Sequence, residues 1–249
     1  MIIQKRFTTP EGLTLVCDVG GRPDASAVIL LHGGGQTRHS WNGAMHRLVD
    51  DGYHVVNYDA RGHGDSDWSP AGNYSLAALA SDLRALLPSV GRPVALVGAS
   101  MGGMTAFYAR GTEPGIADAL VMVDIVLHPA IDGVSKIHNF MTAHRDGFRD
   151  LQEAADAVAS YIPERPRPND SKGLLKNLRW TDDGRLHWHC DPRFLDMLPS
   201  SEPPSFSREL AGVSARVTVP TLLVRGMASD VVDDAGVAEM CRLVPQTQV

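Results

Sequence analysis

A chain of 249 residues with 43% hydrophobic content is long enough for one large α/β domain with an inserted subdomain. The net charge of −6, without any block or stripe of Lys and Arg, leads us to expect no nucleic acid or membrane partner. The first residues run straight into a strand-like alternation, without the apolar stretch of a signal peptide. Cys17, Cys190 and Cys241 match no metal-binding or C-x-x-C spacing, so we expect reduced thiols in a cytoplasmic protein.

The first half of the chain alternates predicted strands and helices. Two β-prone stretches flank the turn at residues 9–12 and predict a hairpin. Ser75 is the predicted N-cap of a helix that ends before Pro88. The predicted strands are 2–8, 13–18, 27–31, 54–58, 94–97 and 119–123, and the predicted helices are 41–50, 76–86 and 105–110. This order predicts a mostly parallel twisted sheet with helices on both faces.

The alternation stops at about Leu127. Residues 129–214 are richer in Pro, Arg, Trp and His, contain a helical stretch at 151–161, and lack a buried-strand run. We therefore predict a core formed by residues 1–126 and 215–249, with residues 127–214 inserted over the sheet. After the insertion, residues 217–224 predict a strand and residues 234–244 a helix.

Ser100 is the candidate nucleophile. It lies in Gly98-Ala99-Ser100-Met101-Gly102, a G-x-S-x-G pattern between an apolar strand and a helix. In this pattern the serine occupies a sharp strand-to-helix turn that presents its hydroxyl above the sheet. The two glycines remove Cβ atoms where the chain bends and where a neighbouring backbone approaches.

Two further loops follow strand ends, where open α/β sheets collect functional residues. His32-Gly33-Gly34-Gly35 predicts either free N–H groups that point at a ligand or a flexible turn. The segment 59–66, DARGHGDS, is best interpreted as a turn in which Asp59, Arg61 and His63 hold their own backbone through ion pairs and hydrogen bonds.

These features resemble the α/β-hydrolase family, in particular its small esterase, haloperoxidase-like and lactonase-like serine hydrolases. The landmarks, in the family's order, are the His-Gly loop with Trp41, Asp59-x-Arg61-Gly62-x-Gly64-x-Ser66, the Ser100 pattern, and Gly226-x-x-Ser229-Asp230. The resemblance implies an α/β-hydrolase fold, mostly parallel, in which the insertion 127–214 is a cap that shapes the substrate pocket. It also implies no cofactor and no metal, because the haloperoxidase side activity of this family needs neither.

The resemblance also implies residue roles. Ser100 would be the nucleophile, with the backbone N–H groups of Met101 and Gly34 as oxyanion donors. Asp230 would orient a histidine, and Asp124, which also ends a strand, is the alternative acid. A serine in place of the aspartate of the epoxide-opening and halide-removing relatives favours acyl chemistry on a small ester, thioester or lactone.

The histidines depart from the family pattern, in which the base follows the acid along the chain. None of the ten histidines follows Asp230, and residues 245–249 resemble the approach to one more strand. We therefore expect the chain to stop before its last strand and catalytic histidine, and to be nearly inactive as it stands. We also expect the strand at 217–224 to lose its outer neighbour and become an exposed edge.

Three alternatives remain open from the sequence. His187 or His189 of the cap could line a pocket or act as a base, although their spacing is weak evidence. A lyase or carbon–carbon bond hydrolase could use the same serine. A noncatalytic binding protein on the same scaffold becomes the better interpretation if the missing histidine is genuine. The sequence leaves the oligomeric state undetermined.

Overall fold

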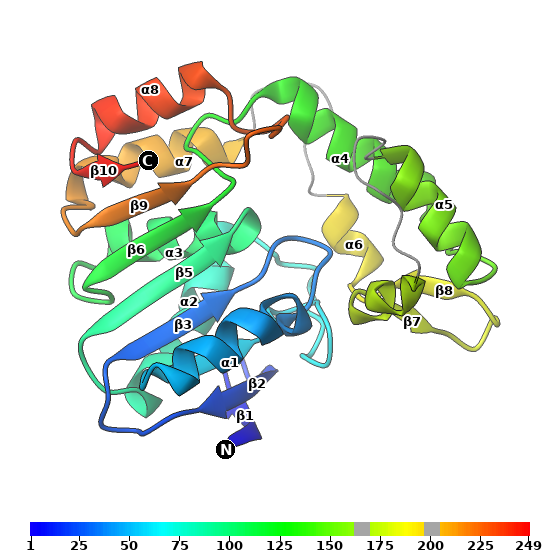
Figure 1. Cartoon of the computed structure of the whole chain (residues 1–249), viewed down its shortest axis with the longest axis horizontal. Helices are drawn as coiled ribbons and strands as arrows, with labels where there is room; N and C mark the ends of the chain where they lie inside the picture. Colours follow the sequence, from blue (N-terminus) through cyan, green and yellow to red (C-terminus); the bar gives the residue numbers. More distant parts are fainter. Residues whose placement is uncertain (162–169, 197–204) are drawn as a thin grey trace.

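The computed structural model describes residues 1–161, 170–196 and 205–249, and these residues form an eight-stranded sheet with a cap beside it (Figure 1). The strand order is β1-β2-β4-β3-β5-β6-β9-β10. The strands are β1 (Ile2–Thr8), β2 (Thr14–Gly20), β3 (Ala27–Leu31), β4 (His54–Tyr58), β5 (Val94–Ala99), β6 (Ala119–Val123), β9 (Thr221–Val224) and β10 (Thr247–Gln248).

The sheet is antiparallel only at the β1-β2 and β2-β4 pairs, and the strands from β4 to β10 are parallel. The predicted hairpin is confirmed, with Gly12 at φ +84° donating its N–H to the Thr9 carbonyl in the turn. In β3 and β4 every residue is buried, which is typical of strands covered on both faces. The mostly parallel α/β sheet predicted from the sequence is confirmed.

Helices pack on both faces of the sheet, as predicted. The core helices are α1 (Asn42–Asp50), α2 (Leu76–Leu86), α3 (Met101–Thr112), α7 (Ser205–Val213) and α8 (Asp234–Leu243). The predicted N-cap is confirmed, because Ser75 Oγ accepts a hydrogen bond from the Ala78 N–H. In Figure 1, α1 lies on the near face of the sheet and α2 and α3 lie behind it.

The cap lies beyond the carboxyl ends of the parallel strands, at the right of Figure 1. Its elements are α4 (Ile131–Ala143), α5 (Leu151–Tyr161), η3 (Ser171–Lys176), β7 (Leu178–Trp180), β8 (Leu186–Trp188) and α6 (Pro192–Leu195). The cap has its own apolar cluster, which includes Phe148, Leu178 and Leu186. Helix α7 falls inside the predicted insertion 127–214, yet Leu210 and Val213 belong to the main core beside α3. The boundary of the cap stays a prediction.

The far edge of the sheet differs from the expectation of an unpaired strand. The strand predicted at 217–224 begins only at Thr221, and its outer side pairs with β10 through Thr247 and Gln248. This pairing covers half of β9, because only Thr221 and Leu222 have partners in β10. On one face of β9, Leu222 and Val224 remain 39% and 44% exposed.

Candidate active site

The backbone at Ser100 has the strained conformation that the G-x-S-x-G pattern predicts. Ser100 lies between β5 and α3 with φ +46° and ψ −115°, a region that non-glycine residues rarely adopt. A Cβ on Gly98 would overlap the backbone of Gly102, and a Cβ on Gly102 would overlap the Leu31 carbonyl. Both glycines are therefore required where the chain turns from strand to helix.

The glycine loop, residues 32–35, lies directly against the Ser100 turn. A Cβ built on Gly33 would lie 3.6 Å from Ser100 Cβ, and one built on Gly34 would lie 3.9 Å from Met101 Cβ. Among the described residues, the N–H groups of Gly34 and Met101 have no hydrogen-bond acceptor. The Met101 amide is in the first turn of α3, where N–H groups lack intrahelical partners. The amides of Gly34 and Met101, without an acceptor among the described residues, thus belong to two residues that contact each other beside the serine.

Two buried histidines hold the glycine loop. His32 Nε2 accepts the Ala60 N–H at 3.0 Å, so its Nδ1 donates to the Gly33 carbonyl at 2.8 Å. His63 Nε2 accepts the Gly35 N–H at 3.1 Å, and its Nδ1 faces the Arg61 carbonyl at 3.1 Å. Burial lowers the pKa of His32 to about 4 and that of His63 to about 3, so both rings are neutral near pH 7. Both nitrogens of each ring are occupied, which gives these histidines a structural role.

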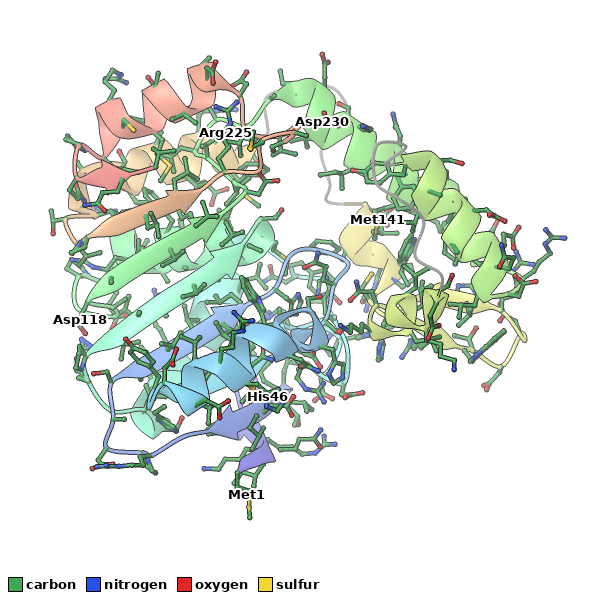
Figure 2. All side chains as sticks on the ribbon, in the orientation of Figure 1. Met1, His46, Asp118, Met141, Arg225 and Asp230 are labelled. Carbon is green, nitrogen blue, oxygen red and sulfur yellow. The ribbon has the colours of Figure 1, made fainter. Side chains whose placement is uncertain are left out.

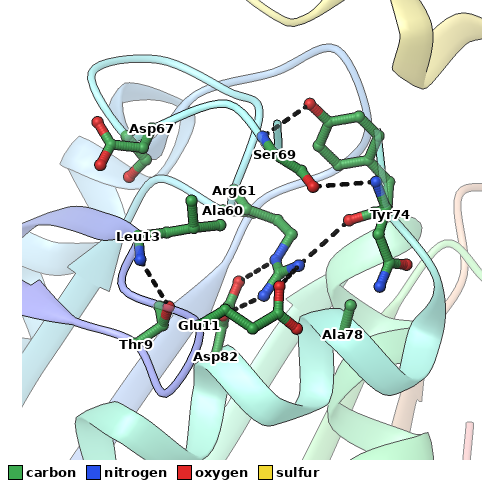
Figure 3. Close-up of polar contacts among 12 residues, drawn as sticks. Thr9, Glu11, Leu13, Ala60, Arg61, Asp67, Ser69, Tyr74, Ala78 and Asp82 are labelled. Atoms are coloured by element: carbon green, nitrogen blue, oxygen red, sulfur yellow. Dashed lines mark hydrogen bonds and ion pairs between the residues drawn. The ribbon is translucent and has the colours of Figure 1, made fainter. Parts of the chain in front are cut away.

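The loop 59–66 is the ion-paired turn predicted from the sequence. Arg61 is fully buried and donates through Nε and one terminal nitrogen to Asp82, at 2.6 and 2.7 Å, and through the other to Glu11 (Figure 3). Asp59 is also fully buried, and its carboxylate bonds Arg38 and the Asp65 N–H. The loop is therefore a rigid support beside the glycine loop.

The two candidate acids lie in different surroundings. Asp230 follows β9 in the loop before α8, and its exposed carboxylate receives a hydrogen bond from Lys136 Nζ of α4 at 2.5 Å. Figure 2 shows Asp230 near the start of the cap helix α4. Asp124 follows β6 with φ +52°, and its Oδ1 accepts the Gly226 N–H at 3.1 Å. The Ser100 N–H donates a hydrogen bond to the carbonyl of Val123, the last residue of β6. Asp124, the next residue, therefore lies at the end of the strand beside Ser100.

The cap histidines have partners of their own. His187 Nε2 lies 2.8 Å from Asp183 in the β7–β8 hairpin, and the backbone of His189 bonds Asn177 and Gly64. Among the described residues, no side chain hydrogen-bonds to Ser100 Oγ, and no group of three or more His, Cys, Asp or Glu could hold a metal ion. Nor does this part of the chain contain a helix long and apolar enough to span a membrane.

Sequence reasoning missed two cap residues that reach the candidate site. Phe194 of α6 packs against Gly34, and Lys136 of α4 bonds Asp230. Neither stands in a recognisable motif, and both approach the site only because the cap folds over the sheet. No spacing of residues in the sequence identifies Phe194 or Lys136 as part of the site.

Comparison with known proteins assigns the family. A family model described as "Alpha/beta hydrolase family" matches residues 28–249. Esterase Rv0045c of Mycobacterium tuberculosis is 31% identical over 234 residues, covering 88% of this chain and 72% of that protein. The mouse sn-1-specific diacylglycerol lipase ABHD11 is also 31% identical over 234 residues, covering 90% and 72%. The chain therefore belongs to the alpha/beta hydrolase family and is a hydrolase.

Solved structures agree with this fold. An alpha/beta hydrolase from Novosphingobium aromaticivorans superimposes with a TM-score of 0.83 at 22% identity, covering 99% of this chain and 88% of that one. A structure of the M. tuberculosis esterase Rv0045c gives a TM-score of 0.74 at 25% identity, covering 100% and 82%. The family expected from the sequence motifs is confirmed.

Proposed function

We propose that this hydrolase cleaves a small carboxylic ester, thioester or lactone through an acyl-enzyme on Ser100. The observation that supports this most directly is the strained Ser100 backbone at the end of β5, with its hydroxyl unbound by any described side chain. Strain of this kind costs on the order of 1–3 kcal/mol and clusters at functional sites. A serine there attacks an acyl carbon, and water later hydrolyses the acyl-enzyme.

The N–H groups of Gly34 and Met101 are the proposed oxyanion donors. They belong to adjoining residues beside Ser100 and have no other acceptor among the described residues. Such donors act on charge that develops in the tetrahedral transition state, and each contributes roughly a hundred- to a thousand-fold in rate. Met101 also lies at the N-terminus of α3, where the helix dipole favours negative charge.

The acid is proposed to be Asp230, with Asp124 as the alternative. Asp230 lies in the loop after β9 and already engages a cation from the cap, Lys136. The carboxylate of Asp124 is engaged by the backbone of Gly226. The histidine base that serine activation needs stays a prediction, because the two buried histidines near the site, His32 and His63, have both ring nitrogens occupied.

The substrate class rests on the names of the relatives. Two proteins that are 31% identical to this chain over 234 residues are an esterase and a diacylglycerol lipase, and a mouse protein phosphatase methylesterase is 29% identical over 140 residues. All three names describe ester cleavage. We propose an ester as the first substrate class to test, with cap residues such as Phe194 bordering the pocket.

The test is hydrolysis of p-nitrophenyl butyrate, by this chain and by the product of its reading frame continued past Val249. Where hydrolysis occurs, Ser100→Ala should reduce kcat by at least about 10⁴-fold, because the nucleophile is lost. Ser89→Ala is the matched control, since Ser89 is exposed before the amino end of β5, away from the site. Unchanged turnover in Ser100→Ala would refute the proposal. Ligand binding without turnover in both proteins would favour a binding protein.

A further inference from the structure

The cap is bonded to the core through a short segment that precedes and includes α6. Cys190 forms an antiparallel bridge with His63, flanked by hydrogen bonds from the Gly64 N–H to the His189 carbonyl (2.8 Å) and from the Asp191 N–H to the Gly62 carbonyl (2.7 Å). This cap segment, residues 189–194, therefore pairs with the loop 59–66 through a single antiparallel bridge. The loop and the cap segment are more than 120 residues apart in sequence.

Buried polar contacts fix this junction. The Asp191 side chain, only 1% exposed, accepts hydrogen bonds from the Tyr74 hydroxyl and from Arg193 Nε and its terminal nitrogen. Arg193 also donates to the carbonyls of Ser69 and Pro70, at 2.9 and 3.1 Å. Charge-assisted hydrogen bonds of this kind are the stronger ones in proteins. The cap segment is thereby held in one place on the core.

Phe194 projects from this segment onto the glycine loop. Phe194 is 6% exposed, and its ring meets the His63 ring edge-on, with centroids 4.6 Å apart and an interplanar angle of 72°. A Cβ built on Gly34 would lie 2.7 Å from Phe194 Cζ, so the ring packs against the glycine backbone itself. The Phe194 side chain thus contacts both Gly34 and His63, whose Nε2 accepts the Gly35 N–H.

His63 connects Phe194 to a peptide bond of the glycine loop. It accepts the Gly35 N–H, which fixes the plane of the Gly34–Gly35 peptide. The preceding peptide is fixed through the Gly33 carbonyl, which accepts from His32 Nδ1 and from the Gln36 N–H at 3.1 Å. Because the N–H of a trans peptide points opposite to its carbonyl, the two bonds to the Gly33 carbonyl set the direction of the Gly34 N–H.

We propose that Phe194 and His63 are positioning residues that hold Gly34 and the Gly34–Gly35 peptide in place, while the bonds to the Gly33 carbonyl orient the Gly34 N–H toward the oxyanion, so that the seating of the cap helps to set the geometry of the oxyanion site. This inference rests on the proposed function of Gly34. It predicts that a change in the cap at Phe194 loosens the glycine loop, whereas an equal change elsewhere in the cap does not. Positioning of this precision matters because small displacements of a donor reduce catalysis strongly.

Amide hydrogen exchange at Gly35, whose N–H is bonded to His63, followed by NMR on this chain, tests the proposal without any need for hydrolysis. In Phe194→Leu, this amide should exchange about ten-fold faster than in the parent, since local opening no longer has to displace the ring. Phe148→Leu is the matched control, because Phe148 is a fully buried cap phenylalanine packed on His144 and Trp188. Exchange within two-fold of the parent in Phe194→Leu, or equal acceleration in both variants, would overturn the proposal.

A second pair of variants separates the roles of ring and hydrogen bond. His63→Gln retains an acceptor for the Gly35 N–H and should keep slow exchange at Gly35, whereas His63→Leu should lose it.

Gly34→Ala should destabilise the chain by its overlap with Phe194, and Phe194→Ala should reverse that effect in the double variant. Additive effects of Gly34→Ala and Phe194→Ala would contradict the packing argument.

In a hydrolytically active form, Phe194→Leu should lower kcat more than it raises KM, because the Gly34 donor acts mainly in the transition state. Ser100→Ala separates the two proposals there. If Ser100→Ala retains hydrolysis, the proposed function fails, while the exchange data still decide whether Phe194 positions the loop. If Ser100→Ala is inactive but Phe194→Leu changes KM alone, the positioning role is wrong and the function stands.

Discussion

The two loops that meet at Ser100 differ in what holds them in shape. The Ser100 turn is held by residues next to it in sequence, since Gly98 and Gly102 leave room for the bend and for β3. The glycine loop is held by residues far away, His63 and Phe194, in the loop 59–66 and in the cap. The turn that carries the proposed nucleophile is thus built locally, whereas its proposed oxyanion donor in the glycine loop depends on tertiary contacts. The comparison predicts different responses to substitution.

The largest expected effect is on the support of the glycine loop. Arg61→Met leaves Asp82 buried without its bidentate partner, and burial already raises the pKa of Asp82. We expect a loss of roughly 3–5 kcal/mol in the free energy of unfolding, measured by urea denaturation. The exposed pair Arg22–Asp24 supplies the control Arg22→Met, which should cause no measurable change. Equal stability of Arg61→Met and the parent would show that the loop 59–66 does not need its ion pairs.

The Ser100 turn is tested by Gly102→Ala. The added Cβ would overlap the carbonyls of Leu31 and His32, which belong to a buried strand end and cannot move aside. We expect a loss of at least about 3 kcal/mol in urea denaturation, the range of severe overpacking. Gly43→Ala is the matched control in α1, where nothing lies within 4 Å, and it should be neutral or stabilising. Similar losses for both variants would argue against a special role of the turn.

The pH dependence of stability distinguishes the two loops, because only the glycine loop rests on buried histidines. Burial lowers the pKa of His63 from 6.5 to about 3. As the pH falls, the unfolded chain therefore binds a proton at His63 at a higher pH than the folded chain does. Stability supported by the neutral ring is complete above pH 6.5 and is lost as the pH falls toward 3, by roughly 1 kcal/mol per pH unit.

His63→Gln should therefore flatten the dependence of the free energy of unfolding on pH between 4 and 6. The control His46→Gln changes an exposed histidine of α1 and should match the parent (Figure 2). A slope in His63→Gln equal to that of the parent would mean that the buried ring does not contribute.

The smallest expected effect is that of Gly35→Ala. Gly35 has φ +72°, and its Cβ would meet only the flexible end of Met141. The cost should be about 1–2 kcal/mol, from the left-handed backbone alone, and Gly35→Asn should be less harmful. Thermal or urea denaturation measures both. A loss in Gly35→Ala as large as that in Gly102→Ala would contradict the view that the glycine loop adapts where the turn cannot.

The sequence by itself determined the sheet, the Ser100 turn and the family. Strand and helix periodicity, the Ser75 cap and the glycines of G-x-S-x-G are local features. They were found as predicted, except that the strand predicted at 217–224 begins only at Thr221. The bonding of Asp59 and His63 to backbone of their own loop was also predictable. The ion pairs of Arg61 with Asp82 and of Asp59 with Arg38, in distant segments, were not predictable. Nor was the pairing of β9 with β10, since a two-residue strand has no periodicity to recognise.

Only the tertiary structure decided how the cap meets the site. The helix α4, the contact of Phe194 with Gly34 and the bond of Lys136 to Asp230 depend on packing between segments far apart along the chain. Local sequence specifies backbone conformation through glycine, caps and periodicity. Which distant side chain fills a given space is set by the summed burial of the whole fold, so Phe194 and Lys136 could not be assigned before the chain was folded.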